Sequence, residues 1–301
     1  DRQLFAYRWV KRLQRVVTDP VGLYLAVIKQ IRPRPGAQLY RRTAAIGVGL
    51  GPLIENASGT RAIRQLFEQM DFVSVRDVFS KDALANWAVP SVRLHTDLCY
   101  VPGAMDVTSR DRLCNRTRCV KRIGMIVRDW PWPEPRMGDT YWRPLLKVAK
   151  YVRSQGKDVE FIAFRSKHRE RAWERRLRNH GATLASWDPY RQQRNEFLAF
   201  LATFDCLVTA RYHGAVFASL LGIPVVCVGV DHKLEMVSAD LGQGARLWRM
   251  PFRYDECIMA LGDIENRYGD SVNAVKQAAV QQRRLGEDLL NEFSIYMSRL
   301  R

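Results

Sequence analysis

The sequence predicts an α/β fold of two Rossmann-like domains, with parallel sheets flanked by helices and a long helix at the C-terminus. From residue 44 onwards, short apolar segments alternate with helical patterns, the order typical of parallel sheets covered on both faces. The chain has 301 residues, enough for two domains. A polar, Arg-rich stretch at residues 103–118 indicates a linker. We therefore expect one domain in residues 1–115 and a second in residues 116–301.

The expected elements follow from apolar runs and from their caps. The first domain has strands at 44–51, 72–75 and 92–94 and helices at 59–70 and 81–87, with Ser80 as the cap of the second helix. The second domain has strands at 123–127, 159–164, 206–209 and 223–230 and helices at 140–155, 196–204, 215–221 and 271–300.

Composition and charge narrow the class of protein. Hydrophobic residues make up 47% of the chain and charged residues 26%, values of a globular protein rather than a disordered one. The formal net charge is +17, which attracts polyanions such as nucleic acid, anionic lipid or phosphorylated substrates. No C-x-x-C pair and no apolar run of about 18 residues occurs, so we expect a cytoplasmic protein without a membrane span.

Polar residues follow three of the predicted strands. Arg76 and Asp77 follow the strand at 72–75, Arg128 follows the strand at 123–127, and the string Arg-Tyr-His-Gly at 211–214 follows the strand at 206–209. In parallel α/β sheets, ligands bind beyond the carboxyl ends of the strands. His213 and Gly214 stand at a helix N-terminus, where N–H groups and the helix dipole favour an anion. We expect Lys233 at the end of the next strand, within reach of Arg211.

These residues lie in segments that resemble the polysaccharide pyruvyl transferase family. The stretch Thr-Ala-Arg-Tyr-His-Gly-Ala-Val-Phe-Ala at 209–218, followed by Gly-Ile-Pro at 222–224 and by Lys233, is similar to the hallmark of that family. Residues 74–80 resemble its S-x-R-D-x-x-S segment, Asp97 resembles its Asp near the end of the first domain, and residues 47–52 resemble its glycine loop. The family's G-N-x-G-D loop does not occur in this sequence, so no acceptor role is carried over from it.

The resemblance implies a GT-B-like enzyme that transfers the pyruvyl group of phosphoenolpyruvate to a glycan hydroxyl pair. Phosphoenolpyruvate would be a substrate, and neither a cofactor nor a metal is expected. Arg211 and Lys233, with Arg128 or Arg76, would hold the carboxylate and phosphate of this donor, with Gly214 at the helix N-terminus. His213 is the expected acid–base group, because imidazole exchanges protons near neutral pH. Asp77, Asp97 and Asp231 are candidate assisting bases, and each is equally well explained as a helix cap or as a partner of an Arg.

Two other functions remain open at this point. A GT-B glycosyltransferase that uses a nucleotide sugar would need an acidic residue for the ribose, and Glu235 lies close to Lys233 in the sequence. A nucleic-acid-binding protein would agree with the net charge. However, the chain contains no nucleic-acid-binding motif, and its basic residues are dispersed rather than aligned along one helix, so we expect no nucleic-acid partner.

A basic N-terminal segment predicts attachment to a membrane surface. Residues 1–35 read as two amphipathic helices, and Arg8, Lys11, Arg12 and Arg15 alternate with apolar residues in the first of them. If the acceptor is linked to a lipid, peripheral binding at the inner face of the plasma membrane would bring the enzyme to it. Each Lys or Arg close to an anionic leaflet contributes about 1 kcal/mol.

We therefore expect the protein to sediment with vesicles that contain anionic lipid, because its basic residues are attracted to the charged headgroups. High salt should release it, and reversing charges within residues 8–15 should weaken the binding. Neutral vesicles are the control. Equal sedimentation with neutral and anionic vesicles would contradict the prediction.

Overall fold

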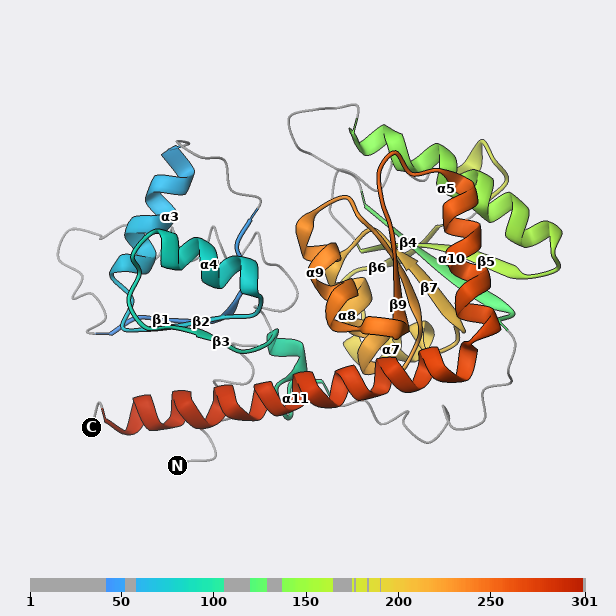
Figure 1. Ribbon diagram of the computed structural model, residues 1–301. Helices are drawn as coiled ribbons and strands as arrows, with labels where there is room; N and C mark the ends of the chain where they lie inside the picture. Colours follow the sequence, from blue (N-terminus) through green and yellow to red (C-terminus); the bar gives the residue numbers. More distant parts are fainter. Residues whose placement is uncertain are drawn as a thin grey trace. The chain divides into compact units, whose positions relative to one another are not determined.

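The computed structural model describes residues 42–51, 58–105, 120–128, 137–164, 175, 177–182, 184–189 and 191–299. The chain forms two compact α/β units (Figure 1). One unit is Asp1–Asp106 together with Gln281–Arg301, and the other is Val107–Val280. Both contain a parallel sheet with flanking helices, and the C-terminal segment is a 31-residue helix, so the predicted fold class is confirmed.

The first unit contains a three-stranded parallel sheet in the order β1-β2-β3. Its strands and helices are β1 (Ala44–Val48), α3 (Ser58–Glu68), β2 (Phe72–Val75), α4 (Val78–Asn86), β3 (Val92–Leu94) and the short 3-10 helix η1 (Leu98–Tyr100). Alternate residues of β2 face opposite sides of the sheet, as the strand period requires. Val73 and Val75 pack with Phe67 of α3 and Leu84 of α4, so these two helices cover one face.

The other face of this sheet is covered by the later part of α11 (Tyr268–Ser298). Phe72 contacts the rings of Phe293 and Tyr296, each at a centroid distance of 5.3 Å. Because this contact is with β2, residues Gln281–Arg301 belong to the first unit, whereas the sequence analysis assigned the whole terminal helix to the second domain.

A line of polar contacts also joins α11 to β2 and β3. The buried Ser74 hydroxyl lies 3.0 Å from Nδ1 of His95, and Nε2 of His95 lies 3.4 Å from the carboxylate of Glu292. The same carboxylate accepts from Arg93 at 2.9 Å. The orientation of α11 on this face is therefore set by polar partners as well as by apolar packing.

The second unit contains a six-stranded parallel sheet in the order β6-β5-β4-β7-β8-β9. Its strands are β4 (Arg122–Val127), β5 (Asp158–Phe164), β6 (Leu184–Trp187), β7 (Cys206–Thr209), β8 (Val225–Val228) and β9 (Ala245–Trp248). Its helices are α5 (Met137–Ser154), α7 (Arg194–Leu201), α8 (Tyr212–Leu220), α9 (His232–Asp240) and α10 (Tyr254–Asn266), with the short 3-10 helix η3 (Gly242–Gly244).

Helices cover both faces of the six-stranded sheet (Figure 1). On one face, Met125 and Val208 pack with residues of α5 and α10 such as Leu145 and Leu261. On the other face, Gly124 of β4 provides space for its neighbours, because a Cβ atom there would lie 2.6 Å from Leu207. Nearly all strand residues in the middle of this sheet are buried, as expected for parallel strands between two helical layers.

One helix start and the position of one lysine differ from the predictions. Asp77, not Ser80, caps α4: its Oδ1 accepts from the backbone N–H of Ser80 at 2.7 Å. Asp77 has the extended backbone of an N-cap residue, whereas Ser80 already lies in the first turn. Lys233 lies in the first turn of α9 rather than at the end of β8, because that helix begins at His232.

Within the described residues, no helix is long and apolar enough to cross a bilayer. The predicted basic helices at 1–35 lie outside the described residues.

Packing of α11 on the first sheet can be tested with two neighbouring leucines. Leu289 is fully buried in the cluster around Phe72, whereas Leu290 is 39% exposed. Leu289→Ala should lower the free energy of unfolding by about 2–5 kcal/mol, because it leaves a cavity. Leu290→Ala, the matched control, should change it by about 0.5 kcal/mol or less. Equal effects in urea denaturation would contradict this packing.

Candidate functional site

The carboxyl ends of β4, β7 and β8 bring together the residues predicted in the second unit. These strands are adjacent and parallel, so they end at the same edge of the sheet. Arg128 follows β4, and its Nη1 lies 2.8 Å from Oδ2 of Asp231, which follows β8. The edge therefore carries Arg128, Arg211, His213 and Lys233 from three neighbouring strand ends.

Arg211 is oriented by the ends of two strands. Its Nε donates to the carbonyl of Val127 at 3.2 Å, and its Nη2 donates to the carbonyl of Phe164 at 3.1 Å. Its guanidinium carbon lies 5.5 Å from the centre of the Phe164 ring. These contacts fix the direction of the guanidinium at the carboxyl ends of β4 and β5.

His213 and Gly214 are the second and third residues of α8, so the predicted position at a helix N-terminus is confirmed. Arg211 is the N-cap residue, and its side chain makes no capping hydrogen bond. By contrast, α4 and α9 are capped by the carboxylates of Asp77 and Asp231. The first turn of α8 therefore lacks the negative cap that those helices have, which makes it the better environment for an anion.

Lys233 and Asp231 share the first turn of α9. Asp231 accepts from the backbone N–H of Leu234 through Oδ1 at 3.1 Å and from Arg128 through Oδ2. Both of its carboxylate oxygens are therefore used, as a cap and as an ion-pair partner. Lys233 is half-buried in the same turn of α9.

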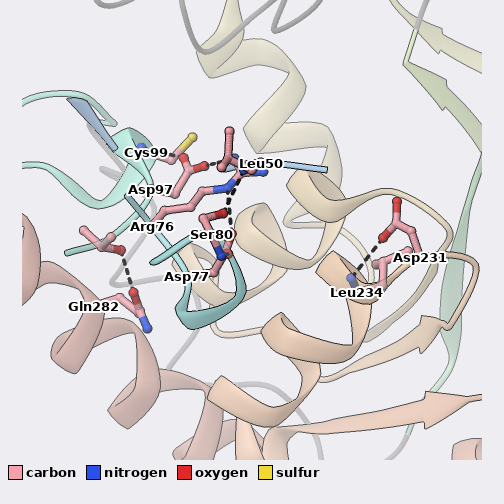
Figure 2. A network of polar contacts seen from close by, with 10 residues as sticks. Leu50, Arg76, Asp77, Ser80, Asp97, Cys99, Asp231, Leu234 and Gln282 are labelled. Atoms are coloured by element: carbon pink, nitrogen blue, oxygen red, sulfur yellow. Dashed lines mark hydrogen bonds and ion pairs between the residues drawn. The ribbon is translucent and has the colours of Figure 1, made fainter. Parts of the chain in front are cut away.

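In the first unit, Arg76, Asp77 and Asp97 form a buried network (Figure 2). Nη1 of Arg76 donates to Oδ2 of Asp97 at 2.5 Å, and Nε of Arg76 lies 3.8 Å from Oδ2 of Asp77. Oδ1 of Asp97 accepts from the backbone N–H of Cys99 at 3.0 Å, which caps η1. Both carboxylates thus cap a helix and contact Arg76.

The glycine loop after β1 is shaped around Arg76. A Cβ atom at Gly49 would lie 2.3 Å from Nε of Arg76, so only glycine allows the guanidinium to lie against this backbone. Gly47 has a φ of +61° and approaches the carbonyl of Thr96. The backbone N–H of Leu50 donates to the buried Ser80 hydroxyl at 2.8 Å. Ser80 therefore ties this loop to α4, a contact that the sequence analysis did not identify.

Thr209 is a second residue whose function the sequence analysis missed, although it belongs to the motif at 209–218. Its hydroxyl donates to the carbonyl of Arg211 at 2.9 Å and accepts from the backbone N–H of Arg211 at 3.1 Å. The sequence feature that could have indicated this contact is a threonine two positions before the arginine.

The described residues also line a depression of about 270 Å³ between β6 and α7. Its lining residues are Ala185, Ser186, Gln192, Glu196, Phe197 and Phe200. None is basic, so the depression does not suit an anionic donor. We place the candidate site at the carboxyl edge of β4, β7 and β8, because Arg128, Arg211 and Lys233 follow these strands.

The buried cysteines of the second unit are not candidates for nucleophilic catalysis. Burial raises the pKa of Cys206 and of Cys227 to about 12, so both thiols are protonated at neutral pH. The same cause raises the pKa of Cys257. All three are buried and pack as small apolar side chains.

Several solved structures resemble this one. S. aureus MnaA, solved with UDP, gives a TM-score of 0.54 at 12% identity over 85% of this chain and 70% of that one. A putative UDP-N-acetylglucosamine 2-epimerase from Listeria monocytogenes gives 0.54 at 14% identity, over 86% and 68%. UDP-GlcNAc 2-epimerase from Neisseria meningitidis gives 0.51 at 12% identity, over 83% and 69%. At these identities the likeness shows the fold alone, which is GT-B-like.

A search of the curated proteins found no match. A family model for polysaccharide pyruvyl transferases, by contrast, matches residues 27–232. The matched region includes the glycine loop, the network around Arg76 and the edge that carries Arg128, Arg211 and His213. Because this match covers more than half of the sequence, the chain belongs to the polysaccharide pyruvyl transferase family.

Proposed function

We propose that this protein transfers the pyruvyl group of phosphoenolpyruvate to a pair of sugar hydroxyls in a bacterial surface glycan. The observation that carries the proposal is the edge formed by β4, β7 and β8. That edge carries a guanidinium oriented by two main-chain carbonyls, a lysine in the first turn of α9 and a helix N-terminus whose N-cap side chain makes no capping hydrogen bond. A donor with one carboxylate and one phosphate needs such fixed positive charge.

The reaction converts a vinyl phosphate into a ketal. The methylene carbon of phosphoenolpyruvate gains a proton and becomes a methyl group, and one sugar hydroxyl oxygen bonds to C2 and loses its proton. The C2–O bond to phosphate breaks, inorganic phosphate leaves, and the second hydroxyl oxygen bonds to C2 with loss of its proton. One proton thus ends on the methyl group and one on phosphate.

His213 is the group proposed for the proton exchange. It is half-buried in the first turn of α8, close in sequence to Arg211, and histidine is the side chain that most often serves as a general acid or base in enzymes. The positive charges at the edge would also stabilise the leaving phosphate. Asp77 and Asp97 remain proposed assisting groups from the first unit.

Replacing His213 should remove transfer with little effect on the fold. His213→Ala is expected to lower turnover by about 10²-fold or more, the usual effect of losing an acid–base group. The exposed His180 provides the control, because His180→Ala removes an imidazole outside the carboxyl edge. Phosphate release and ketal formation would be measured together. Wild-type turnover in folded His213→Ala would refute the catalytic assignment.

Lys233 and Arg211 are expected to bind the donor rather than the acceptor. Lys233→Ala should weaken phosphoenolpyruvate binding by about tenfold or more, because a hydrogen bond to a charged group contributes about 1.5–3 kcal/mol. Arg211→Lys keeps the charge but loses the planar fork, and it should weaken the same binding.

Lys121→Ala is the matched control for these variants. Lys121 directly precedes β4, so the substitution removes one positive charge, as Lys233→Ala does, but at the amino edge of the same sheet. Calorimetry with phosphoenolpyruvate would measure each affinity. Unchanged donor affinity in Lys233→Ala, or an equal loss in Lys121→Ala, would contradict a specific donor pocket. Binding and turnover of a UDP-sugar in place of phosphoenolpyruvate would instead favour the glycosyltransferase alternative.

A further inference from the structure

Thr209 closes a small hydrogen-bonded ring at the end of β7. Its side chain is fully buried, and its Oγ1 both accepts from the backbone N–H and donates to the backbone carbonyl of Arg211. A hydroxyl can do both at once, because it has one donor proton and two lone pairs. The backbone of Arg211 is therefore held on both sides by one side chain.

Gly214 leaves the space that this side chain occupies. A Cβ atom at Gly214 would lie 2.2 Å from Oγ1 of Thr209 and 2.9 Å from Cδ1 of Ile126. The N–H of Gly214 donates to the carbonyl of Arg211 at 3.0 Å. That carbonyl thus accepts from Thr209 and from Gly214, and His213 lies in the turn between these two contacts.

The side chain of Arg211 is held separately from its backbone. Its guanidinium donates to the carbonyls at the ends of β4 and β5. A small rotation of the backbone at Arg211 would move the guanidinium away from these oxygens and would also turn the first residues of α8. The direction of the guanidinium and that of the imidazole therefore depend on the same turn.

We propose that Thr209 is a positioning residue that sets Arg211 and His213 in their working geometry through its hydroxyl group. The proposal rests on the function proposed above for these two residues. Thr209 itself touches neither substrate nor reacting atoms in this proposal. Its effect passes through the backbone of Arg211 and the start of α8.

The test compares Thr209→Val with Thr209→Ser. Valine keeps the shape and the branched Cβ but removes the hydroxyl, whereas serine keeps the hydroxyl and loses only a methyl group. We expect Thr209→Val to weaken phosphoenolpyruvate binding and to lower kcat, each by about tenfold, because it breaks two buried hydrogen bonds to Arg211. Thr209→Ser should restore both quantities to within about twofold of wild type. Thr209→Ala replaces the valine variant if that protein does not fold.

A second measurement does not depend on catalysis. The chain has five histidines, so the imidazole signals of His213 can be assigned by their absence from the spectrum of His213→Ala. In Thr209→Val these signals should shift, and in Thr209→Ser they should match wild type. If the wild-type protein transferred no pyruvyl group, the proposed function would be refuted. The shift of the His213 signals would still test whether Thr209 positions His213.

Three results would overturn the proposal. One is wild-type binding, kcat and His213 signals in folded Thr209→Val. Another is equal impairment of the serine and valine variants, which would show that the effect does not depend on the hydroxyl group. The third is a lowered melting temperature in Thr209→Val with unchanged His213 signals, which would make the hydroxyl a contributor to stability alone.

Discussion

The candidate site depends on the parallel pairing of β4, β7 and β8. Parallel strands end at one edge of a sheet, so residues that follow them are brought together however far apart they lie in the sequence. The ion pair between Arg128 and Asp231 shows this directly, because it joins two residues 103 positions apart in the sequence at a distance of 2.8 Å. The close approach of Leu207 to Gly124 supports the pairing, because a larger residue in β4 would separate it from its neighbours.

The arginines of the candidate site differ in the hydrogen-bond partners described above, which are carboxylates for two of them and main-chain carbonyls for the third. Arg76 and Arg128 bind to aspartates that also cap helices, so part of each positive charge is balanced by a group with a structural function. Arg211 donates to two main-chain carbonyls at the ends of β4 and β5, and these contacts fix the direction of its guanidinium. Each of the three guanidinium groups is thus oriented by partners from other segments of the chain.

The cap of α4 shows what a local sequence pattern can predict about a helix start and what it cannot. The pattern at 76–81 predicts a helix start, and the helix is present, but of the two residues that could cap it Asp77 rather than Ser80 does so. Both residue types are favoured caps, and only the backbone geometry decides between them. Ser80 instead accepts from Leu50, a residue 30 positions away that no local pattern connects with it.

The sequence by itself determined the α/β class, the strand ends that carry the site and the family motif at 209–218. These features follow from hydrophobic periodicity and residue type, which act over a few neighbouring residues. Only the tertiary structure decided that the end of α11 packs on the first sheet. It also decided that the two carboxylate oxygens of Asp231 accept from α9 and from Arg128, and that the hydroxyl of Thr209 binds the backbone of Arg211. Each of these depends on which partner lies within hydrogen-bond or van der Waals distance, and that is set by strand order and packing between segments distant in the sequence.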